Sequence, residues 1–155
     1  MTLREEIADF LGRKRIAVVG VSTETNHFSR SMFRELIKRG YDAIPVNPKA
    51  EAIEGRRCFA SLQAIDPRPD AVLIMTPASQ TDTVVGDCAE RGIEAIWMYR
   101  APGAPGAVSK TAVEFCRENG IHVIPGECPF MFFPRPGFHG IHGFFHKLVS
   151  PALRQ

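Results

Sequence analysis

The amino-acid sequence lacks the short signatures by which many enzymes and membrane proteins are recognised. It has no Gly-x-Ser-x-Gly turn, no Walker-type phosphate loop and no His-Glu-x-x-His zinc motif. No apolar run approaches the roughly 20 residues that cross a bilayer. The chain also starts with acidic residues where a secretory signal has basic and then apolar ones. We therefore expect a cytoplasmic protein, and the sequence offers no catalytic residues.

Charge and cysteine are also absent in the patterns that indicate particular partners. The 155 residues carry a formal net charge of +2 and no long basic run, so neither nucleic acid nor a membrane is an expected partner. The four cysteines are far apart and form no Cys-x-x-Cys pair, which favours reduced thiols. With 45% apolar and 23% charged residues, the composition is that of an ordinary globular chain, and residues 1–155 are predicted to form one domain.

What the sequence does contain is a strand–turn–helix–strand pattern near its start. Residues 16–19 are apolar and mostly β-branched, as in a strand buried on both faces, and they end at Gly20. Apolar residues then recur at helical spacing over 29–39, and Gly40 follows where a left-handed helix end needs glycine. Residues 43–46 form the second predicted strand. This βαβ unit predicts a phosphate-binding turn between its first strand and its helix.

The rest of the chain repeats this alternation. Further helices are predicted over residues 3–11, 80–91 and 103–119, and further buried strands over 71–75, 93–98 and 121–124. Thr2 and Glu5 are expected to form a capping box on the first helix. The pattern predicts an α/β fold with a Rossmann-like, doubly wound, parallel five-stranded sheet in three layers, in the order 3-2-1-4-5. A His- and Phe-rich C-terminal extension, Cys128 to Gln155, departs from this rhythm and includes a short predicted helix over 144–149.

The first turn keeps only part of a dinucleotide-binding fingerprint, Gly-x-Gly-x-x-Gly. The sequence reads Gly20-Val21-Ser22-Thr23-Glu24-Thr25, so Ser22 replaces the second glycine, which normally lets the backbone approach a pyrophosphate. Ser22 adds a hydroxyl donor. Ser29 is expected to cap the following helix and to share its free N–H groups with a phosphate. The alternative is that both serines are only turn and cap residues.

The end of the second strand distinguishes the nucleotides better. NAD sites tend to place Asp or Glu there for the ribose 2′-hydroxyl, but this chain reads Val46-Asn47-Pro48-Lys49 and has no acid before Glu51. Lys49 suits an additional phosphate on the ribose, as in coenzyme A or NADP, unless it is only a solvated surface lysine. NAD is therefore disfavoured.

These segments resemble a known family. The matching segments are Gly20-Val-Ser, Ser29, Gly40-Tyr41-x-x-Ile-Pro-Val-Asn-Pro-Lys49, Ile53-Glu-Gly55 and Phe59-Ala-Ser-Leu62. They are similar to the stand-alone CoA-binding domain family, which is itself similar to the N-terminal CoA-binding domain of the succinyl-CoA synthetase alpha subunit. The resemblance runs from Arg13 to Cys128, and the Val-Asn-Pro-Lys segment is its most specific part.

The resemblance implies which residues bind coenzyme A. The phosphate turn would be lined by Gly20, Val21, Ser22 and Ser29, the 3′-phosphorylated ribose would meet Asn47, Pro48 and Lys49, and the adenine or pantetheine arm would be flanked by Thr76, Pro77 and Ala78. His27 and Phe28 stand where many relatives carry a basic residue and a proline, so Arg30 or His27 would meet the phosphate charge instead. The synthetase's catalytic histidine lies in a further domain outside the stretch of resemblance, so the resemblance implies no ligase activity for this chain alone.

The resulting hypothesis is a protein that binds coenzyme A or an acyl-CoA through the first turn and the rim at Val46–Lys49. It would act as a carrier, a sensor or a subunit without evident catalysis, either as a homodimer or with a partner enzyme subunit. The alternative is an enzyme, either an NADP-dependent oxidoreductase or an acyl-CoA-using transferase in which Cys128 or a tail histidine takes part.

A metal site in the tail is a weaker alternative. His139, His142 and His146 share a face if the tail is a continuous helix, and with Cys128 they could bind a transition metal. The glycines among them argue against a continuous helix, and a free cysteine is more often a buried apolar residue than a ligand. No metal is therefore predicted.

Overall fold

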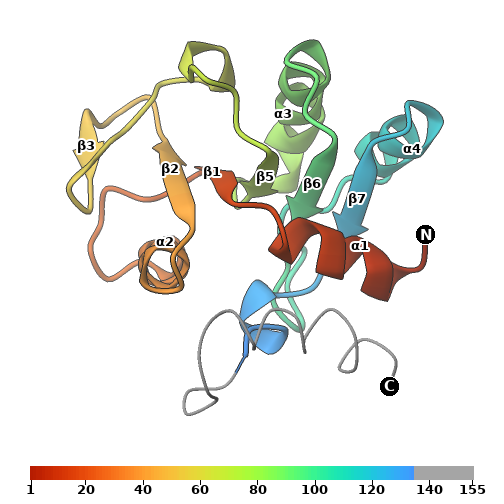
Figure 1. Ribbon diagram of the computed structural model, residues 1–155, viewed down its shortest axis with the longest axis horizontal. Coiled ribbons are helices and arrows are strands. Elements are labelled where there is room, and N and C mark those ends of the chain that lie inside the picture. The colour runs from red at the N-terminus through yellow and green to blue at the C-terminus, as the bar shows by residue number, and fades with distance from the viewer. Residues whose placement is uncertain (135–155) are drawn as a thin grey trace.

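The computed structural model describes residues 1–134 (Figure 1). Its helices and strands are α1 (Leu3–Leu11), β1 (Arg15–Val19), α2 (Phe28–Lys38), β2 (Asp42–Val46), β3 (Ala52–Ile53), β4 (Arg56–Arg57), β5 (Ala71–Ile74), α3 (Ala78–Glu90), β6 (Ala95–Met98), α4 (Lys110–Glu118) and β7 (His122–Pro125). Two short 3-10 turns, η1 (Leu62–Ala64) and η2 (Pro129–Met131), complete it. Within these residues no helix is long and apolar enough to cross a membrane.

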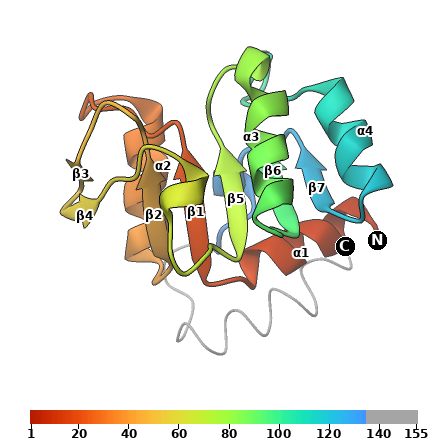
Figure 2. The same ribbon diagram turned by 90° about the horizontal axis from the view of Figure 1, so that it is seen from above.

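Each strand of the main sheet sends side chains to both faces. Ile16 and Val18 of β1 pack with α1 and α2, whereas Ala17 and Val19 pack with α3 and α4. The two apolar cores make the sheet the middle of three layers, with α1 and α2 on one side and α3 and α4 on the other (Figure 1). Figure 2 shows the parallel strands side by side, with α3 and α4 lying over them. The predicted doubly wound α/β fold is confirmed.

The predicted strand order is wrong. The sheet runs β2-β1-β5-β6-β7, which is 2-1-3-4-5 in the numbering of the main strands rather than 3-2-1-4-5. The outer edge of β2 is closed to a further strand because Phe59 pairs there: its N–H donates to Pro45 O at 3.0 Å and its carbonyl accepts from Asn47 N at 2.9 Å. The chain therefore returns across β2, and β5 pairs with the free edge of β1.

The predicted helix boundaries are partly correct. The capping box of Thr2 and Glu5 on α1 is confirmed. In α2 the cap is His27, whose ring accepts from Ser29 N, so the prediction that Ser29 caps this helix is wrong. Helix α4 begins at Lys110, later than predicted, because Gly103 and Gly106 have φ angles of +78° and +59° and form turns. The predicted helix over 144–149 lies outside the described residues.

Trp97 joins three elements on the face covered by α1. Its fully buried indole packs edge-on against Phe10 of α1, with ring centroids 5.3 Å apart, and lies 6.0 Å from the ring of Phe132. The indole N–H donates to the carbonyls of Gly126 and Glu127, at 2.9 and 3.1 Å. The loop after β7 is therefore held against β6 by a buried hydrogen bond as well as by packing.

Thr81 anchors the loop before α4 to α3, and its removal gives a first prediction. The Thr81 side chain is fully buried, and its hydroxyl donates to Ala107 O at 2.6 Å. Thr81→Val keeps the shape of the side chain but leaves the carbonyl unpaired, so the free energy of unfolding should fall by about 1 to 3 kcal/mol. Thr83→Val, at an exposed position of the same helix, should change it little. Urea unfolding of both variants measures the difference, and equal effects would contradict the assignment.

Candidate functional site

The strand order places a topological switch point between β1 and β5. From these neighbouring strands the chain continues into α2 on one face and α3 on the other, so their carboxyl ends open a crevice. A cleft of about 420 Å³ lies there. We call it the switch-point cleft. Its walls are Val19, Gly20, Val46, Asn47, Pro48, Lys49, Ala60, Ser61, Leu62, Thr76, Gln80, Val84 and Asp87.

Gly20 lets the two strand ends approach each other. Its φ angle is +98°, which only glycine adopts readily. A Cβ atom on Gly20 would lie 2.8 Å from Thr76 Cγ2 and 2.9 Å from Thr76 N, closer than van der Waals contact allows. The glycine that the sequence analysis places at the end of the first strand is thus required both by its backbone angle and by the neighbouring strand.

Asn47 joins the rim of the cleft to the first turn. Its amide Nδ2 donates to Val21 O at 2.8 Å, and its Oδ1 accepts from Lys49 N at 2.8 Å. The side chain of Asn47 therefore sets the backbone at Lys49 while it holds the turn that follows β1. Lys49 is exposed at the rim and, within residues 1–134, takes part in no ion pair. Its charge is available to an anionic ligand.

The serines of the turn bond to the protein itself. Ser29 is fully buried, and its Oγ accepts from Ser22 N at 2.9 Å. The same hydroxyl lies 2.8 Å from Nδ1 of His27, which also accepts from Ser29 N at 3.1 Å. A ring nitrogen that accepts from a backbone N–H carries no proton, so the Ser29 hydroxyl donates to it. Ser29 thus shapes the turn from inside and does not line the cleft.

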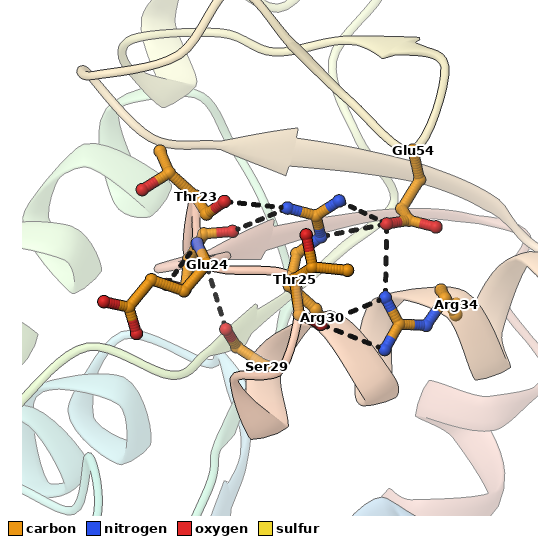
Figure 3. A network of polar contacts seen from close by, with 8 residues as sticks. Thr23, Glu24, Thr25, Ser29, Arg30, Arg34 and Glu54 are labelled. Atoms are coloured by element: carbon orange, nitrogen blue, oxygen red, sulfur yellow. Dashed lines mark hydrogen bonds and ion pairs between the residues drawn. The ribbon is translucent and has the colours of Figure 1, made fainter.

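Arg30 is engaged by a partner that sequence reasoning missed (Figure 3). Its Nε donates to Glu54 Oε2 at 3.0 Å and its Nη2 forms an ion pair with the same carboxylate. Its Nη1 donates to the carbonyls of Ser22 and Thr23, at 3.3 and 3.2 Å. Arg34, one helical turn on, also contacts Glu54, at 3.3 Å. Two like charges at i and i+4 on a helix repel each other, so the spacing of Arg30 and Arg34 was the signal in the sequence for a nearby anion.

The exit of β5 forms the opposite wall of the cleft. The Thr76 hydroxyl is buried and has no hydrogen-bond partner within the part of the chain that the structure describes. Pro77 and Ala78 begin α3 and lie outside the cleft walls. Of the predicted residues, the cleft brings together Gly20, Asn47, Pro48, Lys49 and Thr76. Val21 and Ser22 lie in the turn beside it, which Ser29 and Arg30 hold from the first turn of α2. Sequence reasoning did not predict the wall formed by Gln80, Val84 and Asp87 of α3.

A second cavity of about 380 Å³ lies at the ends of β6 and β7, and Cys128 lines it together with Arg100, Glu127 and Met131. Burial raises the pKa of the Cys128 thiol above its ordinary value, against the opposing effect of hydrogen bonds from Phe130 N, Met131 N and the Tyr99 hydroxyl. The thiol is therefore protonated at neutral pH, which gives no support to a nucleophilic role. The three tail histidines considered as metal ligands, His139, His142 and His146, lie outside the described residues.

The family assignment rests on residues 14–134, which match the family described as the CoA binding domain. The chain belongs to this family. The CoA-binding domain includes the whole of the switch-point cleft and the turn beside it.

Relatives of this CoA-binding domain include stand-alone proteins and parts of larger ones. The chain is 31% identical over 126 residues to the uncharacterised protein YneT of Bacillus subtilis, which covers 81% of this chain and 90% of that protein. It is 25% identical to the alpha subunit of the ADP-forming acetate–CoA ligase II of Pyrococcus furiosus, over 77% of this chain but only 27% of that subunit. A structure of a hypothetical protein from Pyrococcus horikoshii superposes with a TM-score of 0.76 at 24% identity, over 84% of this chain and 89% of that one, and shares the fold.

Gly20→Ala tests the closeness of the two strand ends. We expect a loss of about 1 to 3 kcal/mol in the free energy of unfolding, because alanine is strained at this φ and its methyl group meets the backbone of Thr76. Gly86→Ala is the control, since Gly86 lies within α3 with nothing within 4 Å of its Cβ position. That change should stabilise the protein by up to about 1 kcal/mol. Thermal unfolding of both variants decides, and a neutral Gly20→Ala contradicts the strain argument.

Proposed function

We propose that the protein binds coenzyme A or an acyl-CoA in the switch-point cleft, as a carrier, a sensor or a subunit of a larger enzyme. The observation that carries the proposal is Lys49. It is a cation on the rim of the cleft with no ion-pair partner within residues 1–134, at the strand end where NAD-binding folds place an acid. The family description and the acetate–CoA ligase relatives support coenzyme A as the source of the anion.

The cleft has complementary groups for the parts of this ligand. Lys49 would meet the 3′-phosphate of the ribose, which is the group that distinguishes coenzyme A from 3′-dephospho-CoA. The pyrophosphate would lie against the turn after Gly20 and the start of α2, where backbone N–H groups and the helix dipole favour negative charge. The buried hydroxyl of Thr76, which has no partner within the described residues, would gain one from the ligand.

The proposed role is binding and presentation rather than catalysis. The match covers only 27% of the ligase subunit, so the match does not by itself carry the ligase activity over to this chain. We propose that an acyl-transfer step, if this protein serves one, is completed by a partner chain. The competing candidate is an NADP-dependent oxidoreductase, because Lys49 would suit a 2′-phosphate as well as a 3′-phosphate.

Thermal unfolding with parallel ligands tests the proposal. Coenzyme A, acetyl-CoA, NAD, NADP and ADP are each added in excess, and a ligand that binds only the folded state stabilises it by about 2.7 kcal/mol at a hundredfold excess over Kd. We expect a rise in Tm with coenzyme A or acetyl-CoA and none with NAD. A rise with NADP alone would move the protein to the oxidoreductases, and no rise with any ligand would remove the proposed function.

Lys49→Ala tests which phosphate Lys49 meets. Isothermal titration should show coenzyme A binding about tenfold more weakly, a loss of about 1.4 kcal/mol, because one charge-assisted contact is removed. The affinity for 3′-dephospho-CoA should be unchanged, since that ligand lacks the group in question. Lys110→Ala, at an exposed lysine that starts α4, is the control and should bind both ligands as the parent does. An equal loss for both ligands would place the lysine elsewhere on coenzyme A.

A further inference from the structure

We propose that Glu54, which lies outside the switch-point cleft, sets the ligand affinity of the cleft by positioning the turn after β1 through Arg30 and Arg34. This inference rests on the proposed CoA site and adds to it a positioning residue on the β3–β4 hairpin. Within residues 1–134, the Glu54 carboxylate contacts Arg30 and Arg34 and no wall residue of the cleft. Figure 3 shows the two arginines meeting this carboxylate.

The two arginines hold the carbonyl groups of the turn. Arg30 donates to Ser22 O and Thr23 O, and Arg34 donates to Thr25 O through both terminal nitrogens, at 3.3 and 3.2 Å. A carbonyl oxygen fixed by a guanidinium cannot rotate toward a phosphate and repel it. The N–H groups of Thr23 and Thr25 have no partner within residues 1–134, so they remain for an anion.

Glu54 supplies the charge that lets both arginines approach the same turn. Arg30 and Arg34 lie one turn apart on α2, where two like charges repel. The Arg30 side chain is only 11% exposed and that of Glu54 21% exposed, so solvent screens them less than a surface pair. Without the carboxylate, Arg30 would be a largely buried cation with no counter-ion, and it would reorient toward solvent and release the carbonyls.

The backbone at Glu54 indicates that the side chain is needed there. Glu54 and Gly55 have φ angles of +50° and +73°, the two positive values of a type I′ turn, and the strands beside them pair at Ile53 and Arg56. Glycine or asparagine would adopt the first of these angles with less strain than glutamate. The hairpin itself is fixed by Ile53, which is buried in the core. A strained glutamate on an anchored hairpin gains its stability from the two arginines.

Titration of coenzyme A into Glu54 variants, at a temperature well below the Tm of each variant, tests this role. Glu54→Gln removes the charge, and Glu54→Gly removes the side chain while relieving the backbone angle, so its Tm should stay near that of the parent. Both should bind coenzyme A about tenfold more weakly, the usual scale of coupling to a residue that does not touch the ligand. Glu35→Gln is the control. It breaks a comparable ion pair on α2, Arg39–Glu35 at 2.8 Å, that makes no contact with the turn.

Two further readouts separate positioning from plain stability. Amide hydrogen exchange over residues 21–26 should quicken in the Glu54 variants without ligand and stay unchanged in Glu35→Gln. The hydrogen bond from Arg30 lowers the pKa of Glu54 below its ordinary value of 4.5, and the charges of Arg30 and Arg34 add to this against the opposing desolvation. The stabilisation of the turn by the ionised Glu54 carboxylate is thus complete above pH 4.5 and is lost as pH falls through the lowered pKa.

As pH falls through the lowered pKa of Glu54, the parent loses the charge that Glu54→Gln lacks at every pH. The parent and Glu54→Gln should therefore bind coenzyme A with affinities whose ratio falls toward one in that acidic range. Arg30 and Arg34 are the charged groups that face Glu54 from α2, while on its own hairpin Arg56 pairs with Asp42 and Arg57 lies over the ring of Phe59. If both Glu54 variants bind coenzyme A as tightly as the parent, the inference is wrong and the CoA site stands. If the parent itself does not bind coenzyme A, the proposed function fails first.

Discussion

The pairing of Phe59 with the outer edge of β2 determines where a ligand can bind. Two backbone hydrogen bonds to Phe59 close this edge, so β5 must take the other side of β1. Neighbouring strands whose helices leave to opposite faces then open a crevice. The same segment continues through Ala60, Ser61 and Leu62 and becomes a wall of the cleft. One short connection thus sets both the topology and part of the site.

The basic residues around the first turn have two different roles: two arginines hold the fold, and one lysine is left exposed at the rim of the cleft. Arg30 and Arg34 are used by the fold, because Glu54 and the carbonyls of the turn occupy their donors. Lys49 has no such partner within residues 1–134 and is held at the rim by the backbone contact of Asn47. The sequence alone cannot tell these cations apart, since each lies close to the turn or the rim along the chain. The distinction depends on the hairpin, which brings one carboxylate to the arginines and none to the lysine.

The features that could be predicted from the sequence are those that depend on residues close together along the chain. The buried strands, the glycine that ends β1 and the cap of α1 depend on neighbouring residues, and they are confirmed. The strand order depends on a pairing that Phe59 makes with Pro45 and Asn47 across a loop, and the position of Glu54 depends on a hairpin too short to show a strand pattern. The start of α4 was misplaced because a Gly- and Pro-rich stretch fits a turn as well as a helix opening. The strand order and the position of Glu54 were therefore missed because contacts between distant residues decide them, whereas the start of α4 was missed because its local sequence is ambiguous.

Trp97 provides a fluorescence signal for unfolding that comes from the core on the α1 face of the sheet, away from the apolar wall of the cleft. It is the only tryptophan in the sequence, so the tryptophan emission of this protein comes from one buried, hydrogen-bonded indole between α1, β6 and the loop after β7. Its side chain belongs to the core on the α1 face, whereas the apolar wall of the switch-point cleft, including Val19, Leu62 and Val84, belongs to the core on the other face. The fluorescence of Trp97 therefore follows the loss of tertiary structure from the opposite face of the sheet to this wall, and the protein carries its own unfolding reporter.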